Sequence, residues 1–300
     1  MTAQIVPDSE HKGIVAALPL PLRNYALLAR FDRPIGWWLL FWPCAWGLLL
    51  AGGEGRWDLL LWMLAGSIAM RGAGCVYNDI VDADIDRQVA RTAARPVASG
   101  RVGKRAAWIW LVALCLVGLI VLLQLRFEAQ LVALGSLALV AAYPFMKRIT
   151  GFPQAWLGLV FTWGAPVGWA ALRSDRLDVM AALYAGAILW CIGYDTIYAC
   201  QDREDDALVG IGSSALTLGR HVKAGVAAFY GGATLLWALA VWLLRPDWVA
   251  LLALLPAALH LGWQAASLDP DDGDNALARF RSNRTLGLLL ALACWVVGNA

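Results

Sequence analysis

The chain has 300 residues, of which 60% are hydrophobic and only 15% are charged, and its formal net charge is +2. A soluble domain carries about a quarter of charged residues, so this composition excludes a soluble domain and indicates a polytopic membrane protein. The small net charge, without a long basic tract, gives no sign of nucleic-acid binding.

Apolar runs close to the length that crosses a bilayer as a helix, about 20 residues, follow one another along almost the whole chain. Runs of this length satisfy their backbone groups in lipid only as helices. We therefore predict an all-α membrane protein. Residues 1–300 are expected to form a single domain that begins with a polar N-terminal segment at 1–23. The predicted spans are 34–52, 58–77, 106–125, 129–146, 152–172, 178–200, 224–244, 247–267 and 284–299.

Lys and Arg residues decide the predicted orientation. Most of the 24 lie in the N-terminal segment or after the second, fourth, sixth and eighth spans. Because basic residues gather on the cytoplasmic side, the N-terminus is predicted to be cytoplasmic, and nine spans put the C-terminus outside. The expected location is a bacterial inner membrane.

An acidic cluster, NDIVDADID, follows the second predicted span. On a helix Asn78, Asp82 and Asp86 share one face, Asp79 borders it and Asp84 points elsewhere. Carboxylates beside hydrocarbon are costly and indicate a function, and oxygen donors on one stripe suit Mg²⁺. The alternative without a function is a solvated loop. The RTAARP segment that follows disfavours this alternative, because Arg91 and Arg95 are donors for phosphate oxygens.

A second acidic cluster, QDREDD, follows the sixth predicted span and places Asp202 and Asp206 four residues apart. Four predicted helices separate the two clusters and return the chain to the same side. This placement indicates two pseudo-repeated four-helix units whose acidic clusters face one cavity. Deeper in the sixth span, Asp195 and its neighbour Tyr194 are functional candidates, although Asp195 also suits a structural hydrogen bond.

Two further basic sites lie at span ends. In YPFMKR, Lys147 is a candidate contact for a diphosphate, with a membrane-anchoring role as the alternative. In RFDRPIG, Arg33 is a candidate for binding a carboxylate in bidentate fashion, and an interface anchor is the competing interpretation.

At these residues the chain resembles the UbiA superfamily of intramembrane prenyltransferases. The pattern NDxxDxxxD is met by Asn78, Asp79, Asp82 and Asp86, and DxxxD by Asp202 and Asp206. The stretches RPIGWWLLFWP, RTAARPVASG, YPFMKRITGFPQ and GYDTIYACQDREDD are similar to the superfamily's 4-hydroxybenzoate branch, which acts in ubiquinone synthesis.

The resemblance implies about nine helices around a central cavity, dependence on Mg²⁺, a polyprenyl diphosphate donor and an aromatic acceptor, 4-hydroxybenzoate. Two Mg²⁺ ions would be held by both motifs, and Arg91, Arg95 and Lys147 would stabilise the leaving diphosphate. Asp195 and Tyr194 would orient or ionise the phenol, and Arg33 with Asn78 would bind the acceptor.

Three alternatives remain open at this point. A prenyltransferase of the same superfamily with another acceptor is one. A cation-coupled transporter is another, because intramembrane acids mark ion paths, but its acids should lie near the bilayer midplane. A phosphoalcohol transferase needs a glycine in its acidic motif that NDIVDADIDRQVAR lacks.

Overall fold

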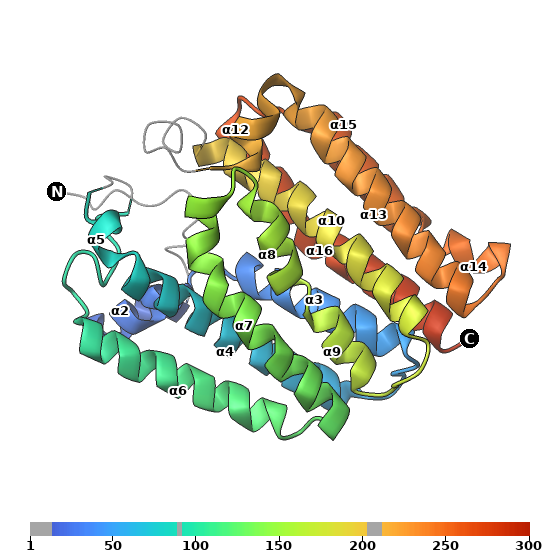
Figure 1. The fold of residues 1–300 in the computed structure, drawn as a ribbon, viewed down its shortest axis with the longest axis horizontal. Helices are drawn as coiled ribbons and strands as arrows, with labels where there is room; N and C mark the ends of the chain where they lie inside the picture. The colour runs from blue at the N-terminus through green and yellow to red at the C-terminus, as the bar shows by residue number, and fades with distance from the viewer. Residues whose placement is uncertain (1–13, 89–91, 203–211) are drawn as a thin grey trace. The chain divides into compact units, whose positions relative to one another are not determined.

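The computed structural model describes residues 14–88, 92–202 and 212–300, and all regular structure in these ranges is helical (Figure 1). The chain packs as two units, one of residues 1–38 and 61–124 and the other of residues 39–60 and 125–300. The boundary between the units falls within α3 and α4, so it does not divide the sequence into two halves. The single domain and the duplicated four-helix unit stay predictions.

Between residues 14 and 124, the part of the chain that the structure describes forms six helices. They are α1 (Ile14–Ala17), α2 (Leu20–Leu28), α3 (Ile35–Leu50), α4 (Trp57–Val81), α5 (Ala83–Asp86) and α6 (Lys104–Leu122).

The described residues after 124 form nine further α-helices and two 3₁₀ helices. They are α7 (Phe127–Ile149), α8 (Pro153–Phe161), α9 (Gly164–Ala170), α10 (Leu177–Ala199), η1 (Cys200–Asp202), α12 (Ser214–Leu218), η2 (Gly219–His221), α13 (Val222–Leu244), α14 (Trp248–Leu252), α15 (Leu255–Ser267) and α16 (Gly273–Gly298).

Exposed apolar side chains confirm that the chain is a membrane protein. On α6, Ile109, Val112, Leu116 and Ile120 are all more than half exposed, and their spacing of three to four residues puts them on one face of the helix. A continuous apolar face open to solvent would be unstable in water, whereas lipid solvates it.

Five helical segments in the described ranges are long and apolar enough to cross a bilayer. They are Trp57–Val81, Lys104–Leu122, Leu177–Ala199, Ser214–Leu244 and Trp248–Ser267. Ile35–Leu50 and Phe127–Tyr143 are shorter apolar helices. Several spans were therefore predicted correctly, while the count of nine is not confirmed.

The predicted span 152–172 is interrupted between α8 and α9. Pro166 has no N–H to donate to the carbonyl of Thr162, and its ring would clash with that carbonyl in a continuous helix. At the C-terminal end of α8, the Thr162 hydroxyl and backbone N–H both donate to the carbonyl of Gly158, at 2.7 and 3.2 Å. The predicted span 247–267 divides in the same way, with Pro256 in the first turn of α15.

The last helix begins before its predicted start at residue 284. The Asp272 carboxylate accepts hydrogen bonds from the backbone N–H groups of Asp274 and Asn275, at 3.0 and 3.1 Å, and so caps α16. Arg279 and Arg281, which precede the predicted span, therefore lie on this helix.

Close packing of α10 on α13 forms the core of the second unit. Gly186 and Gly193 are seven residues apart on α10, and each meets an aromatic ring of α13, Trp237 and Tyr230 respectively. A seven-residue repeat keeps both contacts on one helix face. The absence of a side chain at each glycine lets the two backbones approach.

A group of buried indoles completes this core. Trp46 packs edge-on against Trp190 and Trp237, with ring centroids 4.8 and 5.6 Å apart. The Trp190 ring N–H donates to Asn283 Oδ1 at 2.7 Å, and Tyr230 donates to Gln264 Oε1 at 2.9 Å. These bonds satisfy polar atoms that would otherwise be costly inside the bundle.

Candidate active site around the first acidic motif

The first acidic motif spans the end of α4 and all of α5. The backbone N–H of Asp82 still bonds to the carbonyl of Asn78, and that of Asp86 to Asp82, both at 2.8 Å. The chain therefore keeps helical i to i+4 bonding through the bend at Asp82, where α4 ends and α5 begins.

Burial separates the carboxylates of this motif. Asp79 and Asp86 are buried, Asn78 and Asp82 are partly exposed, and the Asp84 side chain is 73% exposed. Asp84 pairs with Arg87 at 3.0 Å and with Lys104 at 3.6 Å. Asp84 thus points away from the two buried carboxylates, as the helix spacing predicts.

Two arginines hold the buried carboxylates. Arg30 Nη2 donates to Asp79 Oδ1 at 2.8 Å. Arg95 Nη1 lies 2.8 Å from Asp86 Oδ2 and 3.5 Å from Asp79 Oδ1, so one guanidinium joins both acids. Buried charges require such partners, because an unpaired one carries a large desolvation cost.

Both arginines contact Oδ1 of the Asp79 carboxylate, and the other oxygen has a different environment. The Oδ2 atom is buried and has no hydrogen-bond partner among the described residues. In the same residues no three His, Cys, Asp or Glu side chains converge as a metal site. Asp79 and Asp86 are instead bridged through Arg95.

The segment that carries Arg95 is fixed against α5. The Thr92 hydroxyl donates to the carbonyl of Asp86 at 2.9 Å, and Arg87 Nε donates to the carbonyl of Ala98 at 3.1 Å. Arg91 lies outside the described residues. Arg95, one of the two arginines predicted from RTAARP, is thus brought to the motif.

For binding a carboxylate, the sequence prediction chose Arg33 of RFDRPIG over Arg30. Arg30 follows α2 with φ of 57°, in the left-handed region that non-glycine residues seldom adopt, and its Nη1 donates to the carbonyl of Leu27. Arg33, the predicted acceptor-binding residue, lies 3.5 Å from Asp32. No local pattern distinguishes the two arginines, because the contact of Arg30 with Asp79 is a long-range one.

Arg71 is a second residue that sequence reasoning missed. It lies within α4, inside the predicted span 58–77, and its Nη1 donates to Cys75 Sγ at 2.7 Å. Its spacing from Asn78 and Asp82 is 7 and 11 residues, which puts all three on one helix face. That spacing was the available signal.

The second acidic motif is described only at its start. Asp202 ends η1, directly after α10. The Asp202 side chain lies outside the described part of the structure, as do the side chain of Lys147, near the end of α7, and the whole of Asp206.

Ser214, which follows the second acidic motif in the sequence, belongs to a buried polar cluster. The Ser214 N–H donates to Gln154 Oε1 at 2.9 Å, and the Ser214 and Thr196 hydroxyls lie 2.7 Å apart. Gln154 belongs to YPFMKRITGFPQ and Thr196 to GYDTIYACQDREDD. Two of the stretches that carry the family resemblance therefore meet at Ser214.

Asp195 and Tyr194, the two residues of α10 predicted to orient or ionise the phenol, differ in their surroundings. Asp195 is partly exposed, whereas Tyr194 is 1% exposed. The Tyr194 ring packs edge-on against Trp190 at 4.7 Å, and its hydroxyl accepts from Cys191 Sγ at 3.0 Å. Tyr194 is thus part of the helix packing, and a catalytic role for it stays a prediction.

A model of the UbiA prenyltransferase family matches residues 40–294, which is most of the chain. This chain belongs to the UbiA prenyltransferase family. The membership confirms the resemblance read from the two acidic motifs. It also sets aside the transporter and phosphoalcohol-transferase alternatives.

Curated relatives within the UbiA family share about two fifths of their residues with this chain. The mitochondrial 4-hydroxybenzoate polyprenyltransferase of Caenorhabditis elegans is 40% identical over 282 residues, covering 93% of this chain and 79% of that protein. The human one is 40% identical over 293 residues, covering 96% and 78%. The Arabidopsis thaliana one is 40% identical over 277 residues, covering 91% and 68%.

Solved UbiA homologues confirm the fold. The apo structure of a homologue from Aeropyrum pernix has a TM-score of 0.71 at 28% identity and covers 86% of this chain and 97% of its own. An Archaeoglobus fulgidus homologue bound to DMAPP and Mg²⁺ has a TM-score of 0.69 at 16% identity, covering 92% and 99%.

The relatives correct one prediction. The three curated relatives named above are mitochondrial enzymes of eukaryotes, so the prediction of a bacterial inner membrane is wrong. Lys and Arg bias reports on the two sides of a membrane and carries no information on which membrane it is. The multi-pass membrane character is unaffected by this correction.

Proposed function

We propose that this chain transfers a polyprenyl group from polyprenyl diphosphate to 4-hydroxybenzoate, releasing diphosphate, in ubiquinone biosynthesis. The new C–C bond forms at the ring carbon ortho to the hydroxyl group as the allylic C–O bond of the donor breaks, and that ring carbon gives up its proton to a base. The observation that carries this proposal is 40% identity to 4-hydroxybenzoate polyprenyltransferases over more than nine tenths of the chain. The family match alone leaves the acceptor open.

The first motif fits a divalent cation such as Mg²⁺. Carboxylate and amide oxygens are the donors that Mg²⁺ prefers, and the buried, unbonded Oδ2 of Asp79 is an oxygen that a cation would satisfy. The proposed ligands, for two ions, are Asn78, Asp79, Asp82, Asp86, Asp202 and Asp206. When bound, such ions neutralise the diphosphate as a leaving group.

Basic side chains bind the diphosphate oxygens in this proposal. Arg95 contacts Asp86 and Asp79 of the first acidic motif, and this proximity supports its proposed role in binding the diphosphate. Arg91 and Lys147 complete the proposed set. Each guanidinium or ammonium donates to oxygens whose negative charge grows as the allylic C–O bond breaks, and that interaction lowers the barrier.

The acceptor is oriented at two points. Asp195, with Tyr194 beside it in sequence, holds or deprotonates the phenol, which activates the ortho ring carbon. Arg33 and Asn78 bind the acceptor, with Arg33 on its carboxylate. Arg71 is a second candidate for that carboxylate because it is an ionisable residue within an apolar helix, which indicates function.

The test uses membranes that contain the full chain, supplied with 4-hydroxybenzoate and geranyl or longer prenyl diphosphates. Product is resolved by mass, with Mg²⁺ or with EDTA. We expect prenylated 4-hydroxybenzoate that disappears with EDTA and returns when Mg²⁺ is restored. Product that persists in EDTA would contradict the metal proposal, and absence of product from folded protein would contradict the proposed acceptor.

A further inference from the structure

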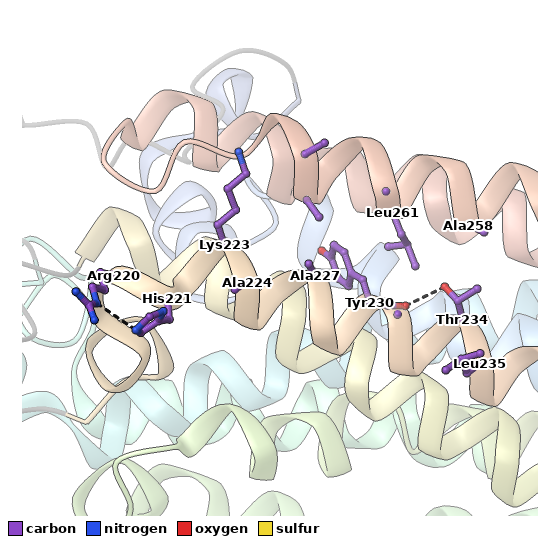
Figure 2. Close-up of a pocket in the computed structure, with 14 residues that line it drawn as sticks. Arg220, His221, Lys223, Ala224, Ala227, Tyr230, Thr234, Leu235, Ala258 and Leu261 are labelled. Carbon is purple, nitrogen blue, oxygen red and sulfur yellow. Dashed lines mark hydrogen bonds between the residues drawn. The ribbon is translucent and has the colours of Figure 1, made fainter.

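A groove of about 930 Å³ lies on the second unit between α13 and α15 (Figure 2). Both helices belong to segments apolar and long enough to cross a bilayer. The groove contains none of the residues proposed for the prenyl transfer.

Small residues shape the walls of this groove. They are Ala224, Ala227, Gly231, Ala258, Gly262 and Ala265. A Cβ atom added at Gly231 or Gly262 would meet nothing within 4 Å, so the space beside each glycine is open. Tyr230 and Leu261 are buried and close the groove from below.

One end of the groove is basic. Arg220, His221 and Lys223 line it there, and all three are exposed. Among the described residues that line the groove there is no acid; Asp269 and Asp271 follow α15 but are not part of the lining.

The length of the groove matches one leaflet of a bilayer. From Ala224 to Leu235 an α-helix rises about 16 Å at ~1.5 Å per residue, and half of a hydrocarbon core of ~30 Å is about 15 Å. A basic end joined to an apolar groove of this length has the charge and shape of a phosphate with an attached acyl chain.

We propose that the groove between α13 and α15 binds an anionic glycerophospholipid of the surrounding bilayer. An acyl chain lies along the small residues, and the phosphate contacts Lys223 and Arg220. A transmembrane helix of a second copy would also fit small residues, but it would leave the basic end without a function. Charge complementarity therefore favours the lipid.

The test is native mass spectrometry of the full chain in detergent, titrated with phosphatidylglycerol or with phosphatidylcholine. We expect preferential binding of phosphatidylglycerol, weakened about fivefold by Lys223→Gln and further by adding Arg220→Gln, since each basic residue contributes about that factor at a membrane surface. Arg245→Gln, at the other end of the same helix, is the matched control and leaves binding unchanged.

A second variant tests the apolar part. Gly231→Leu puts its Cβ atom in open space on the groove side, so the variant should fold and lose the bound phosphatidylglycerol. Equal binding of both lipids, or binding that survives Lys223→Gln and Gly231→Leu together, would overturn the proposal. The proposal would also be overturned if the unchanged chain is a dimer that Gly231→Leu converts to a monomer. Displacement of phosphatidylglycerol by an equimolar polyprenyl diphosphate would overturn it as well.

Discussion

Asp84 and Asp86 are two residues apart on the same short helix, yet their environments are opposite. Asp86 is buried against Arg95, whereas Asp84 is exposed and pairs with Arg87 and Lys104. A surface ion pair contributes little to stability or function. A buried carboxylate of the acidic motif is a candidate ligand for the diphosphate-bound cation.

This contrast gives a matched pair of substitutions. Asp86→Asn should lower kcat/KM about 100-fold or more, because it removes a charge that the proposed cation needs. Asp84→Asn should stay within about twofold of the unchanged protein. Initial rates with saturating Mg²⁺ measure both, and equal losses in the two variants would contradict the assignment.

The acceptor carboxylate gives a second test at single residues. Arg33→Gln should raise the KM for 4-hydroxybenzoate at least about tenfold, the value of one charge-assisted pair, and leave the KM for the prenyl diphosphate unchanged. Arg71→Gln is made in parallel. If only Arg71→Gln raises the acceptor KM, the role belongs to Arg71.

At the scale of elements, the α10–α13 pair depends on glycines in two different settings. Gly193 faces the Tyr230 ring, and a Cβ atom there would be in steric conflict with it. Gly231, on α13, faces open space. The same substitution therefore has opposite expected effects at the two positions.

Gly193→Ala should destabilise the protein by about 1–3 kcal/mol, the usual cost of overpacking. Gly231→Ala should be neutral or stabilising by up to about 1 kcal/mol, since alanine is the better helix former. Thermal unfolding in a fixed detergent compares the two variants. A lower transition temperature for Gly231→Ala than for Gly193→Ala would contradict the packing described here.

Sequence patterns predicted the apolar spans and the acidic motif, because hydropathy and helix spacing are local properties. They missed the start of α16 at Gly273, since the polar and charged residues before 284 read as a loop. They also missed the break caused by Pro166 within an apolar run. Asp79 pairs with Arg30, which is 49 residues away in the sequence, and no local pattern can predict such a contact.

At the scale of the whole molecule, the two acidic motifs belong to different packing units, the first motif at residues 78–86 and the second at 202–206. The proposal requires both for binding one diphosphate. A ligand that binds only the folded protein stabilises it by about 2.7 kcal/mol at a hundredfold excess over Kd. That stabilisation is a readout independent of turnover.

Mg²⁺ with a non-hydrolysable prenyl diphosphate analogue should therefore raise the unfolding temperature of the unchanged chain. Asp82→Ala and Asp202→Ala should each abolish the rise and the turnover while the protein still folds. Asp84→Ala is the control and should retain both. A full thermal shift in either of the first two variants would show that its motif is not needed for donor binding.

The pairing of Asp79 and Asp86 with Arg30 and Arg95 has a consequence for how the protein withstands loss of its metal. Two carboxylates and two guanidinium groups sum to no net charge, so the motif carries its own counter-ions. Like-charge repulsion, which would otherwise open a bare acidic site, is thereby suppressed. Chelation should accordingly be a reversible switch of activity, with the emptied protein remaining a storable, refillable form.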